Sequence, residues 1–233
     1  MNSEGVNLSL VACSHELKTP LCLIRQLTFE LDQEKTLEKQ QEIIRRIRLT
    51  TERSLRLADN LTKIARLEGA MFELEPIQIN GLCQEVVDEL LPLSRALAQT
   101  FDIKISSQST VVVGHRELLR SLLLGLVDNS LNYTGSKKIR ITARQNHGET
   151  VLAVRDFGPI MDLSQFRKLS AKLGKTNAPI SARPMASSLG LVIADKFASA
   201  MQGRLSVSRH HAGGVTFRAH LPLSSQLNLL ELA

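Results

Sequence analysis

A histidine and a glutamate stand side by side near the start of the chain, and a threonine follows about one helical turn later. His15, Glu16 and Thr19 lie in the octapeptide Ser14-His15-Glu16-Leu17-Lys18-Thr19-Pro20-Leu21. A neutral imidazole attacks an electrophile such as a phosphoryl group when a neighbouring carboxylate orients the ring and takes up its proton. The segment therefore suits phosphoryl transfer, and the alternative is a solvated surface histidine without chemistry.

The octapeptide lies in a helical pattern with an apolar stripe. With Leu17 set to zero at about 100° per residue, the stripe falls within about 40° and His15 at about 160°. The pattern predicts a buried stripe and a His15 that faces solvent, with Glu16 beside it. Pro20 lacks a backbone N–H, so it is predicted to kink the helix just after His15, for a catalytic or a purely structural reason. The stripe consists of Leu10, Cys13, Leu17, Leu21, Ile24, Thr28 and Leu31.

The octapeptide resembles the phosphoacceptor box of sensor histidine kinases, which typically reads S-H-E-L-[KR]-T-P-L. The resemblance implies that His15 receives a phosphoryl group from ATP. It also implies that Glu16 is the general base and that Thr19 helps to place a water for the reverse, phosphatase reaction.

Length and composition favour a globular protein. The chain has 233 residues, 43% of them hydrophobic, which allows one large or two small domains. It has no run of about 18 apolar residues and no signal peptide, so we expect a soluble protein without a membrane segment in this chain. Cys13, Cys22 and Cys83 lack metal-site spacing and lie in apolar helical patterns, which predicts reduced core thiols. The expected location is the cytoplasm, including the cytoplasmic part of a membrane-anchored sensor.

The net charge of +6 invites a nucleic-acid partner, but the pattern argues against one. The only dense basic cluster, Arg45-Arg46-Ile47-Arg48, is flanked by Glu42 and Glu52. Aromatic residues make up 3% of the chain, with no Trp and one Tyr, so no stacking platform accompanies the cluster. A solvated helix face is the better interpretation, and the excess charge still suits an acidic partner surface or nucleotide phosphates.

The first third of the chain predicts a helical hairpin. Helices are expected over about 5–31 and 37–67, with a polar connection at 32–36. Such helices pack antiparallel, and apolar residues of the second helix recur at three- and four-residue spacings. We expect the hairpin to form a homodimer as a four-helix bundle, which the resemblance also implies. The recurring residues are Ile44, Ile47, Leu55, Ala58, Leu61 and Ala65.

The rest of the chain predicts an α/β sandwich. Strands are expected at 72–77, 101–105, 110–113, 138–144, 150–155, 204–209 and 215–221. Helices are expected at 80–99, beginning at an Asn80 cap, at 114–132 and at 189–201, with a loop at 161–185. The fold class is α+β: a helical hairpin (1–69, dimerisation and histidine phosphotransfer) followed by a sandwich of the histidine kinase/Hsp90-type ATPase class (70–233, catalytic ATP binding).

One amide interrupts an apolar helix row. Asn129 lies in the row of Leu118, Leu122 and Leu126, with Gly125 one turn before it. A buried amide needs a partner, which either a metal–phosphate complex or a neighbouring backbone group supplies.

Three segments resemble the nucleotide boxes of the same kinases in the same order. Residues 126–134 resemble the N-box, and Asp156-Phe157-Gly158 resembles the start of the D-x-G-x-G box. Ser188-Leu189-Gly190-Leu191 resembles the end of the second glycine box. Together with the histidine box, they extend the resemblance over nearly the whole chain.

The resemblance implies ATP and Mg²⁺ as cofactors. It assigns Asn129 to the Mg²⁺ that bridges the phosphates, Asp156 to the adenine amino group and Tyr133 to the adenine pocket. Gly190, at a helix start, lets backbone N–H groups approach the phosphates, and residues 161–187 form the ATP lid. The other nucleotide-binding residues implied are Asn132, Gly158 and Leu191.

Several positions depart from the family pattern. Gly125 stands where Asn is usual, Asn132 where Lys is usual, and Ala186 and Ser188 where Gly is usual. Pro159-Ile160 lacks the second glycine of the D-x-G-x-G box, and Phe166 is the only remnant of a phenylalanine motif. Because a branched side chain restricts φ and close backbone approach, we expect a weaker ATP grip.

The sequence thus predicts the core of a sensor histidine kinase, which phosphorylates His15 and passes the group to an Asp of a response regulator receiver domain. The first alternative is a degenerate relative that binds ATP poorly and acts as a phosphatase or dimeric docking scaffold. The second is an ATPase of the same sandwich class without phosphotransfer.

Overall fold

The computed structural model describes residues 3–67, 73–105, 111–133, 138–146, 148–171, 173 and 189–223. The chain divides into two compact units, a helical hairpin and a sandwich. Among the described residues, no helix has the length and apolar character that crossing a bilayer requires.

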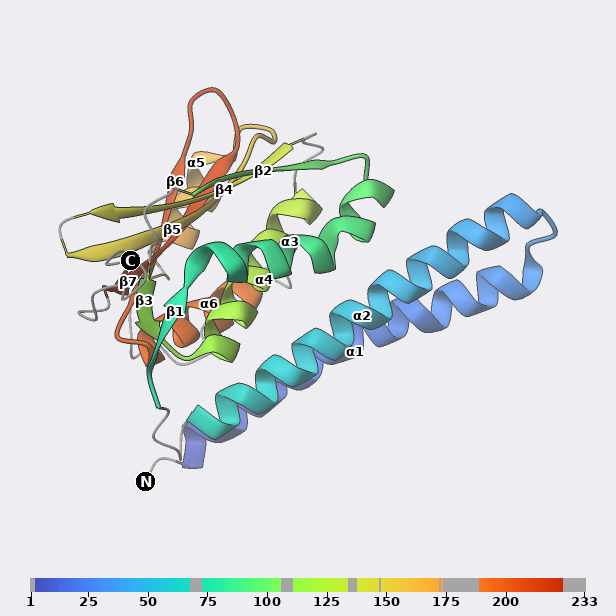
Figure 1. Cartoon of the computed structure of the whole chain (residues 1–233). Coiled ribbons are helices and arrows are strands. Elements are labelled where there is room, and N and C mark those ends of the chain that lie inside the picture. The colour runs from blue at the N-terminus through green and yellow to red at the C-terminus, as the bar shows by residue number, and fades with distance from the viewer. Residues whose placement is uncertain are drawn as a thin grey trace. The chain divides into compact units, whose positions relative to one another are not determined.

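The hairpin consists of α1 (Ser3–Gln33) and α2 (Leu37–Leu67), which run antiparallel (Figure 1). The polar break between them is three residues long. The Glu34 carboxylate accepts from the Thr36 N–H at 2.9 Å, and the Gln40 side-chain amide donates to the Glu34 carbonyl oxygen at 2.6 Å. The predicted hairpin is therefore confirmed, and α1 continues as a helix through Pro20.

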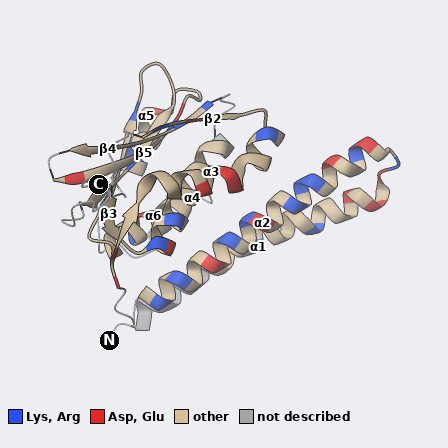
Figure 2. Cartoon of the chain, viewed as in Figure 1, with Lys and Arg blue, Asp and Glu red and all other residues tan. Residues whose placement is uncertain are grey.

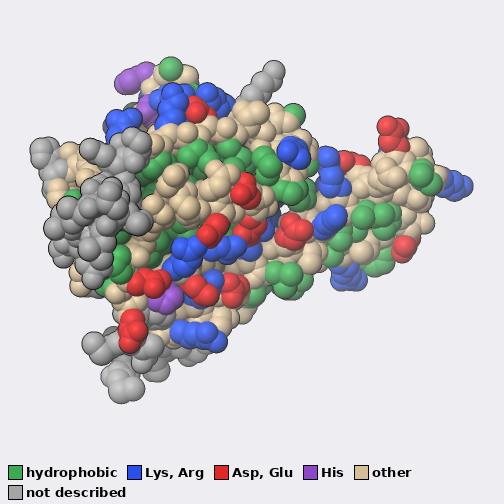
Figure 3. All heavy atoms as spheres, in the orientation of Figure 1, with side chains coloured by type: hydrophobic (Ala, Val, Ile, Leu, Met, Phe, Trp, Pro, Cys, Tyr) green, Lys and Arg blue, Asp and Glu red, His purple; other side chains and the backbone are tan. Residues whose placement is uncertain are grey.

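The prediction that the apolar stripe of α1 is buried is wrong for the described hairpin, because Leu17, Ile24 and Leu31 are half-buried and Leu21 and Thr28 are exposed. Leu27, outside the stripe, is 1% exposed, whereas Leu21 is 56% exposed and Thr28 is also exposed. On α2 the buried residues are Ile43 and Ile64, each 8% exposed. One neighbouring helix covers only part of a broad apolar face, and Figure 3 shows hydrophobic side chains at the hairpin surface. Exposed apolar residues on the two helices include Leu23, Phe29, Leu37, Ile44 and Leu55.

The cysteine prediction holds for one thiol and is wrong for another. Cys83 is buried, and burial raises the pKa of its thiol to about 12. Cys22 is exposed, because it lies on the side of α1 away from Leu27. The Cys13 side chain lies outside the described residues.

The basic cluster of α2 is a solvated helix face, as the flanking acids predict. Arg45 pairs with Glu42 at 3.1 Å, one turn earlier, and both side chains are about half exposed, at 47% and 54%. Figure 2 shows basic and acidic residues interspersed along the hairpin. Exposed pairs of this kind contribute little to stability.

The sandwich is built on a mixed five-stranded sheet with the order β2-β4-β5-β7-β6 (Figure 1). Strand β2 runs parallel to β4, and the other neighbours are antiparallel. A second sheet pairs β1 with β3, and Pro76 lies on β1 beside Val113. The strands are β1 (Glu75–Gln78), β2 (Thr100–Ile105), β3 (Val111–Gly114), β4 (Lys138–Asn146), β5 (Glu149–Asp156), β6 (Arg204–Arg209) and β7 (Val215–Pro222).

Three helices cover one face of the large sheet: α3 (Ile79–Ala96), α4 (Arg116–Tyr133) and α6 (Leu189–Ala200) (Figure 1). Alternate strand residues such as Ile139, Ile141 and Val154 are fully buried toward these helices, as a sheet with one covered face requires. The predicted α/β sandwich is confirmed.

Two predicted helix starts are wrong by one or two residues. Helix α3 begins at Ile79 after Gln78, whose side chain makes no cap bond, so Asn80 is not the cap. Ile79 is 0% exposed, and its burial places the first turn one residue earlier. Gly114 belongs to β3 rather than to α4, which begins at Arg116.

A helix interrupts the segment predicted as a loop. Helix α5 (Leu163–Ser170) begins after Asp162, whose carboxylate accepts from the Ser164 N–H at 2.8 Å and the Gln165 N–H at 3.3 Å. This cap is the sequence signal that the loop prediction overlooked. Phe166 lies on α5, half-buried. Residues 174–188, including Ala186 and Ser188, lie outside the described residues.

Candidate functional site

The phosphoacceptor candidate lies on the exposed side of α1. His15 is exposed, as predicted from its position opposite the stripe. The Thr19 hydroxyl is exposed and donates to the His15 carbonyl oxygen at 3.1 Å. Such a bond is ordinary for a helical threonine and leaves the hydroxyl oxygen able to accept from water. A bulky phosphate donor can therefore reach the imidazole from solvent.

Glu16 has a less polar environment than its neighbour. The side chain is half-buried, and this partial burial raises the pKa of its carboxyl, while the adjacent His15 opposes the rise. A raised pKa strengthens a carboxylate as a proton acceptor. The pair therefore joins an accessible nucleophile to a base of increased basicity.

In the sandwich, Asn129 lies where the apolar row of α4 opens toward solvent. Leu118, Leu122 and Leu126 are at most 1% exposed, whereas Asn129 is half-buried. The amide therefore remains accessible to a ligand while its helix is held in the core. The side chains of Asn132 and Tyr133, at the end of α4, lie outside the described residues.

The start of α6 lies beside α4 at the glycine that replaces the usual asparagine. A Cβ on Gly125 would lie 4.0 Å from the Gly190 carbonyl oxygen. Gly190 is exposed, and a Cβ there would meet no described atom within 4 Å, so this helix start has open space for a phosphate. The Leu191 side chain is buried, 4% exposed, so only its backbone can face a ligand.

Asp156 is the buried carboxylate of the sandwich, 6% exposed at the end of β5. Its Oδ1 accepts from the Gly158 N–H at 3.1 Å and the Val215 N–H at 3.2 Å. Burial raises the pKa of this carboxyl, against the opposing effects of the two amides and of His210 and Arg155. Neither amide uses Oδ2, and that oxygen suits a ligand donor such as an exocyclic amino group.

Two glycines in the turn after β6 press directly against the Asp156 segment. A Cβ on Gly214, whose φ is +79°, would lie 2.2 Å from the Asp156 carbonyl oxygen. A Cβ on Gly213, whose φ is +97°, would lie 2.6 Å from the Gly158 carbonyl oxygen. Only glycine fits either position, so this turn positions Asp156.

The same turn is tied to the segment that follows Asp156. The Gly214 N–H donates to the Pro159 carbonyl oxygen at 3.2 Å, and Arg209 donates to the Met161 carbonyl oxygen at 3.1 Å. His210 contacts the Thr216 hydroxyl at 2.7 Å, and burial is the main cause that lowers the pKa of its imidazole. Sequence reasoning predicted a hairpin turn here and missed its role, because the contact of Arg209 with Met161 joins residues 48 positions apart and that of Gly214 with Pro159 joins residues still further apart.

The departures around Gly158 alter the surface more than the core. Gly158 is half-buried, Ile160 is 60% exposed, and Pro159 supplies its carbonyl oxygen to Gly214. The Phe157 ring is exposed. The guanidinium groups of Arg155 and Arg140 lie 4.4 Å and 5.3 Å from the centre of this ring. The segment is therefore anchored through its backbone, without the second glycine.

The chemistry of the described donors fits Mg²⁺ only together with a nucleotide. Among the described residues, no cluster of three His, Cys, Asp or Glu could bind a metal ion by itself. Mg²⁺ typically takes one or two protein oxygens and completes its octahedron with phosphates and water. The half-exposed amide of Asn129 can supply such an oxygen.

Comparisons with known proteins agree with this arrangement. Residues 12–70 match the His Kinase A (phospho-acceptor) domain, and residues 114–225 match the histidine kinase-, DNA gyrase B-, and HSP90-like ATPase. Sensor protein SphS of Synechococcus elongatus is 30% identical over 226 residues, which cover 92% of this chain and 54% of SphS. The chain spans about half the length of the curated relatives it matches.

Solved structures show the same fold. Acinetobacter baumannii histidine kinase AdeS, 17% identical, superposes with a TM-score of 0.64 over 91% of this chain and 98% of AdeS. Histidine kinase ThkA, solved in complex with response regulator protein TrrA, is 20% identical, with a TM-score of 0.63 over 91% of this chain and 60% of ThkA. With a phosphoacceptor domain followed by an ATPase domain, the chain belongs to the sensor histidine kinases.

Proposed function

We propose that this chain transfers the γ-phosphoryl group of ATP to His15 and then to an aspartate of a response regulator. The observation that carries the proposal is the exposed imidazole beside a partly buried carboxylate whose pKa is raised. The imidazole nitrogen forms a bond to the γ-phosphorus, the bond to the ADP oxygen breaks, and Glu16 takes the ring proton.

The nucleotide site that we propose is centred on Asp156 and Asn129. Asp156, oriented by two backbone amides, accepts from the adenine amino group through Oδ2. Asn129 binds the Mg²⁺ that accompanies the phosphates, and Gly190 and the Leu191 backbone face the phosphates. Gly158 holds the Asp156 turn, Asn132 and Tyr133 border the adenine pocket, and residues 161–187 form the lid.

The partners that we propose are a receiver domain and a second copy of this chain. ThkA, which shares this fold, was solved with a response regulator protein. Leu37, Ile44 and Leu55, which share one side of α2, and Leu21 of α1 are exposed apolar residues that a second hairpin can cover in a four-helix bundle. The phosphotransfer domain then comprises 1–69 and the catalytic domain 70–233, and both act in the cytoplasm, where ATP and the regulator are available.

A second candidate is a relative that keeps the phosphatase or docking role and binds ATP weakly. Ile160 favours it, because this residue follows Pro159 and occupies the place of the second glycine near the proposed adenine carboxylate. Thr19, placed one turn after His15, supplies the hydroxyl that would orient a water in the phosphatase reaction.

Incubation with γ-labelled ATP and Mg²⁺ tests the proposal. We expect an acid-labile, alkali-stable label that is lost in His15→Gln and retained in His211→Gln, an exposed histidine in the β6–β7 turn. Equal labelling of His15→Gln and the wild type would show that another residue accepts the phosphoryl group. Absence of label in the wild type together with weak ATP binding would favour the second candidate, whereas absence of label with intact ATP binding would contradict both candidates.

A further inference from the structure

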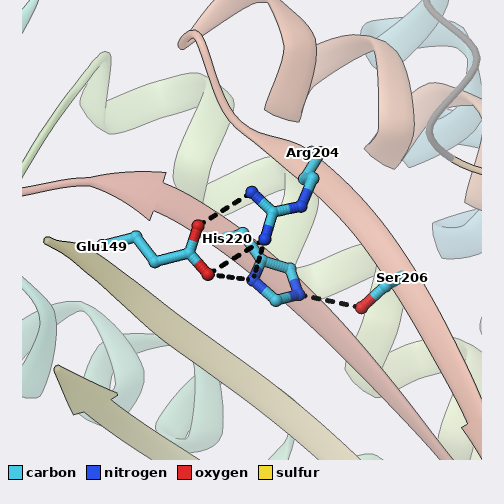
Figure 4. A network of polar contacts seen from close by, with 4 residues as sticks. All are labelled: Glu149, Arg204, Ser206 and His220. Atoms are coloured by element: carbon cyan, nitrogen blue, oxygen red, sulfur yellow. Dashed lines mark hydrogen bonds and ion pairs between the residues drawn. The ribbon is translucent and has the colours of Figure 1, made fainter. Parts of the chain in front are cut away.

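Away from the proposed nucleotide site, a serine, a histidine and a glutamate form a hydrogen-bonded chain on the large sheet. The His220 ring lies between them, with Nδ1 2.6 Å from the Glu149 carboxylate and Nε2 2.9 Å from the Ser206 hydroxyl (Figure 4). The Arg204 guanidinium holds both oxygens of the same carboxylate, at 2.8 and 3.0 Å.

The register of three neighbouring strands brings these residues together. His220 on β7 pairs with Arg204 on β6, and Ser206 pairs with Arg218. Paired residues of antiparallel strands point to the same face, and alternate residues point to opposite faces. The intervening Leu205, Ala219 and Leu221 are buried toward the helices. The hydrogen-bonded serine, histidine and glutamate therefore lie on the other face of the sheet.

The charges on the sheet determine which ring nitrogen carries the proton. Hydrogen bonds from Arg204 and His220 lower the pKa of the Glu149 carboxyl, so this group is a carboxylate and only accepts. Arg204 Nη2 also lies 3.0 Å from Nδ1, but the shorter contact of 2.6 Å joins Nδ1 to a carboxylate, which can only accept, and this favours a proton on Nδ1. The neutral ring then presents the lone pair of Nε2 to the Ser206 hydroxyl. This is the tautomer that a general base for a serine nucleophile requires.

We propose that Ser206, with His220 as its base and Glu149 as the group that positions the ring, is a nucleophile toward small activated acyl esters. The Ser206 Oγ forms a bond to the acyl carbon, and the bond to the leaving oxygen breaks. The hydroxyl proton passes to Nε2 and from there to the leaving oxygen. Water then attacks the acyl-serine in the same way, which releases the acid and restores the hydroxyl.

Access and charge on this face limit the acyl donor to a small one. Ser206 is half-buried, the His220 side chain is 14% exposed and the Arg204 side chain is 57% exposed, so reagents approach from the open side of the sheet. Arg218, the strand partner of Ser206, already donates to the Ser208 hydroxyl on the same face. Its guanidinium supplies N–H donors for the developing oxyanion.

A fluorophosphonate probe and p-nitrophenyl acetate, applied to the full chain without ATP, test the proposal. We expect stoichiometric fluorophosphonate labelling of Ser206, found by peptide mass spectrometry, and slow release of nitrophenol. Ser206→Ala should lose both. Ser208→Ala changes a serine on the same face whose hydroxyl is paired with Arg218 among the described residues, and this variant should retain both.

Two further variants test whether the hydrogen bonds among Ser206, His220 and Glu149 serve catalysis or only structure. His220→Ala should label at least about a hundredfold more slowly, and added imidazole should restore part of the rate. Glu149→Gln should slow labelling by at least about tenfold. The thermal unfolding midpoint of this variant is measured in parallel. Wild-type protein that takes no label, labelling unchanged in Ser206→Ala, or a His220→Ala loss that imidazole does not rescue would overturn the proposal. None of these readouts depends on His15 or on nucleotide binding.

Discussion

The two units of this molecule place their functional groups in opposite ways. In the hairpin, the important side chains are consecutive in sequence, and His15 is exposed on a single helix. In the sandwich, the buried carboxylate of Asp156 depends on a backbone amide of Val215, 59 residues away, and on the close approach of Gly214. The hairpin thus exposes the proposed phosphoacceptor on one helix, whereas the proposed nucleotide site of the sandwich is assembled from residues far apart in sequence.

This difference predicts how each unit responds to mutation. A change beside His15 should alter the chemical step and leave the fold intact, because few tertiary contacts depend on it. A change in the β6–β7 turn should disturb stability and nucleotide binding together, because the same atoms serve both.

The largest effect is expected for Glu16→Gln, which removes the base next to His15. Autophosphorylation should fall by about 10²–10⁴, while the far-ultraviolet spectrum and ATP affinity remain unchanged. Thr19→Ala is the matched comparison one turn along the helix, and it should mainly impair dephosphorylation of the phosphorylated regulator. Equal loss of both activities in both variants would contradict the separation of roles.

The acid limb of the autophosphorylation profile gives a second readout of the same residue. Because burial raises the pKa of Glu16, the base becomes protonated at a higher pH than an ordinary glutamate. The rate should therefore fall as the pH drops through this raised pKa, and Glu16→Gln should lose that limb.

Gly214→Ala should give the next largest effect. The added Cβ would lie 2.2 Å from the Asp156 carbonyl oxygen at a φ of +79°, so the turn must move. We expect a loss of about 2–4 kcal/mol in the free energy of unfolding, together with weaker ATP binding. Gly190→Ala is the control, since its Cβ meets no described atom within 4 Å and the apo fold should tolerate it. Equal stability of the two variants in denaturant titrations would refute the positioning role of the turn.

Leu21→Asp tests the open side of the hairpin. Leu21 is 56% exposed in a single chain, and burial against a second hairpin would contribute about 1.5–3 kcal/mol per copy. The variant should raise the dimer dissociation constant by at least about tenfold in light scattering. Leu97→Asp, at a 39% exposed leucine of the sandwich, should leave the dimer intact. A wild-type chain that is monomeric at tens of micromolar would exclude the four-helix bundle.

The contrast between the units also explains what the sequence could predict. The His15 position, the two helices and the β4–β5 and β6–β7 hairpins follow from local periodicity and turn residues, and the structure confirms them. Leu21 was expected to be buried because periodicity finds the apolar face but not how many neighbours cover it. The functions of Gly213 and Gly214 depend on contacts with Asp156 and Gly158, which no local pattern encodes. Helix α5 was missed although Asp162 marks its start.

Asp156→Asn should have a smaller and more selective effect. The asparagine keeps an oxygen for the Gly158 and Val215 amides but places an amide NH₂ at Oδ2, so ATP affinity should fall by at least about tenfold. Stability should not fall at neutral pH. Burial raises the folded-state pKa of Asp156, so its contribution to stability is present below the unfolded-state pKa and is lost as the pH rises through the folded-state value.

Asn129→Ala should weaken ATP binding only in the presence of Mg²⁺, and equal losses with and without the metal would contradict the assignment of Asn129 to Mg²⁺.

Ile160→Gly is expected to have the smallest effect, and it tests whether the missing glycine limits the site. Ile160 is 60% exposed, so its removal costs little packing, and the free energy of unfolding should change by less than about 1 kcal/mol. ATP should bind a few-fold more tightly if backbone freedom after Pro159 is what the natural chain lacks. Calorimetry on Ile160→Gly and on Leu163→Gly, a 46% exposed position on α5, separates a local effect of glycine from general loosening. Tighter ATP binding in Ile160→Gly alone would support the idea that the missing glycine limits ATP affinity. Unchanged affinity in both would mean that the Gly214–Pro159 hydrogen bond already holds the segment in a binding geometry, and that this chain does not need the second glycine because the β6–β7 turn replaces it.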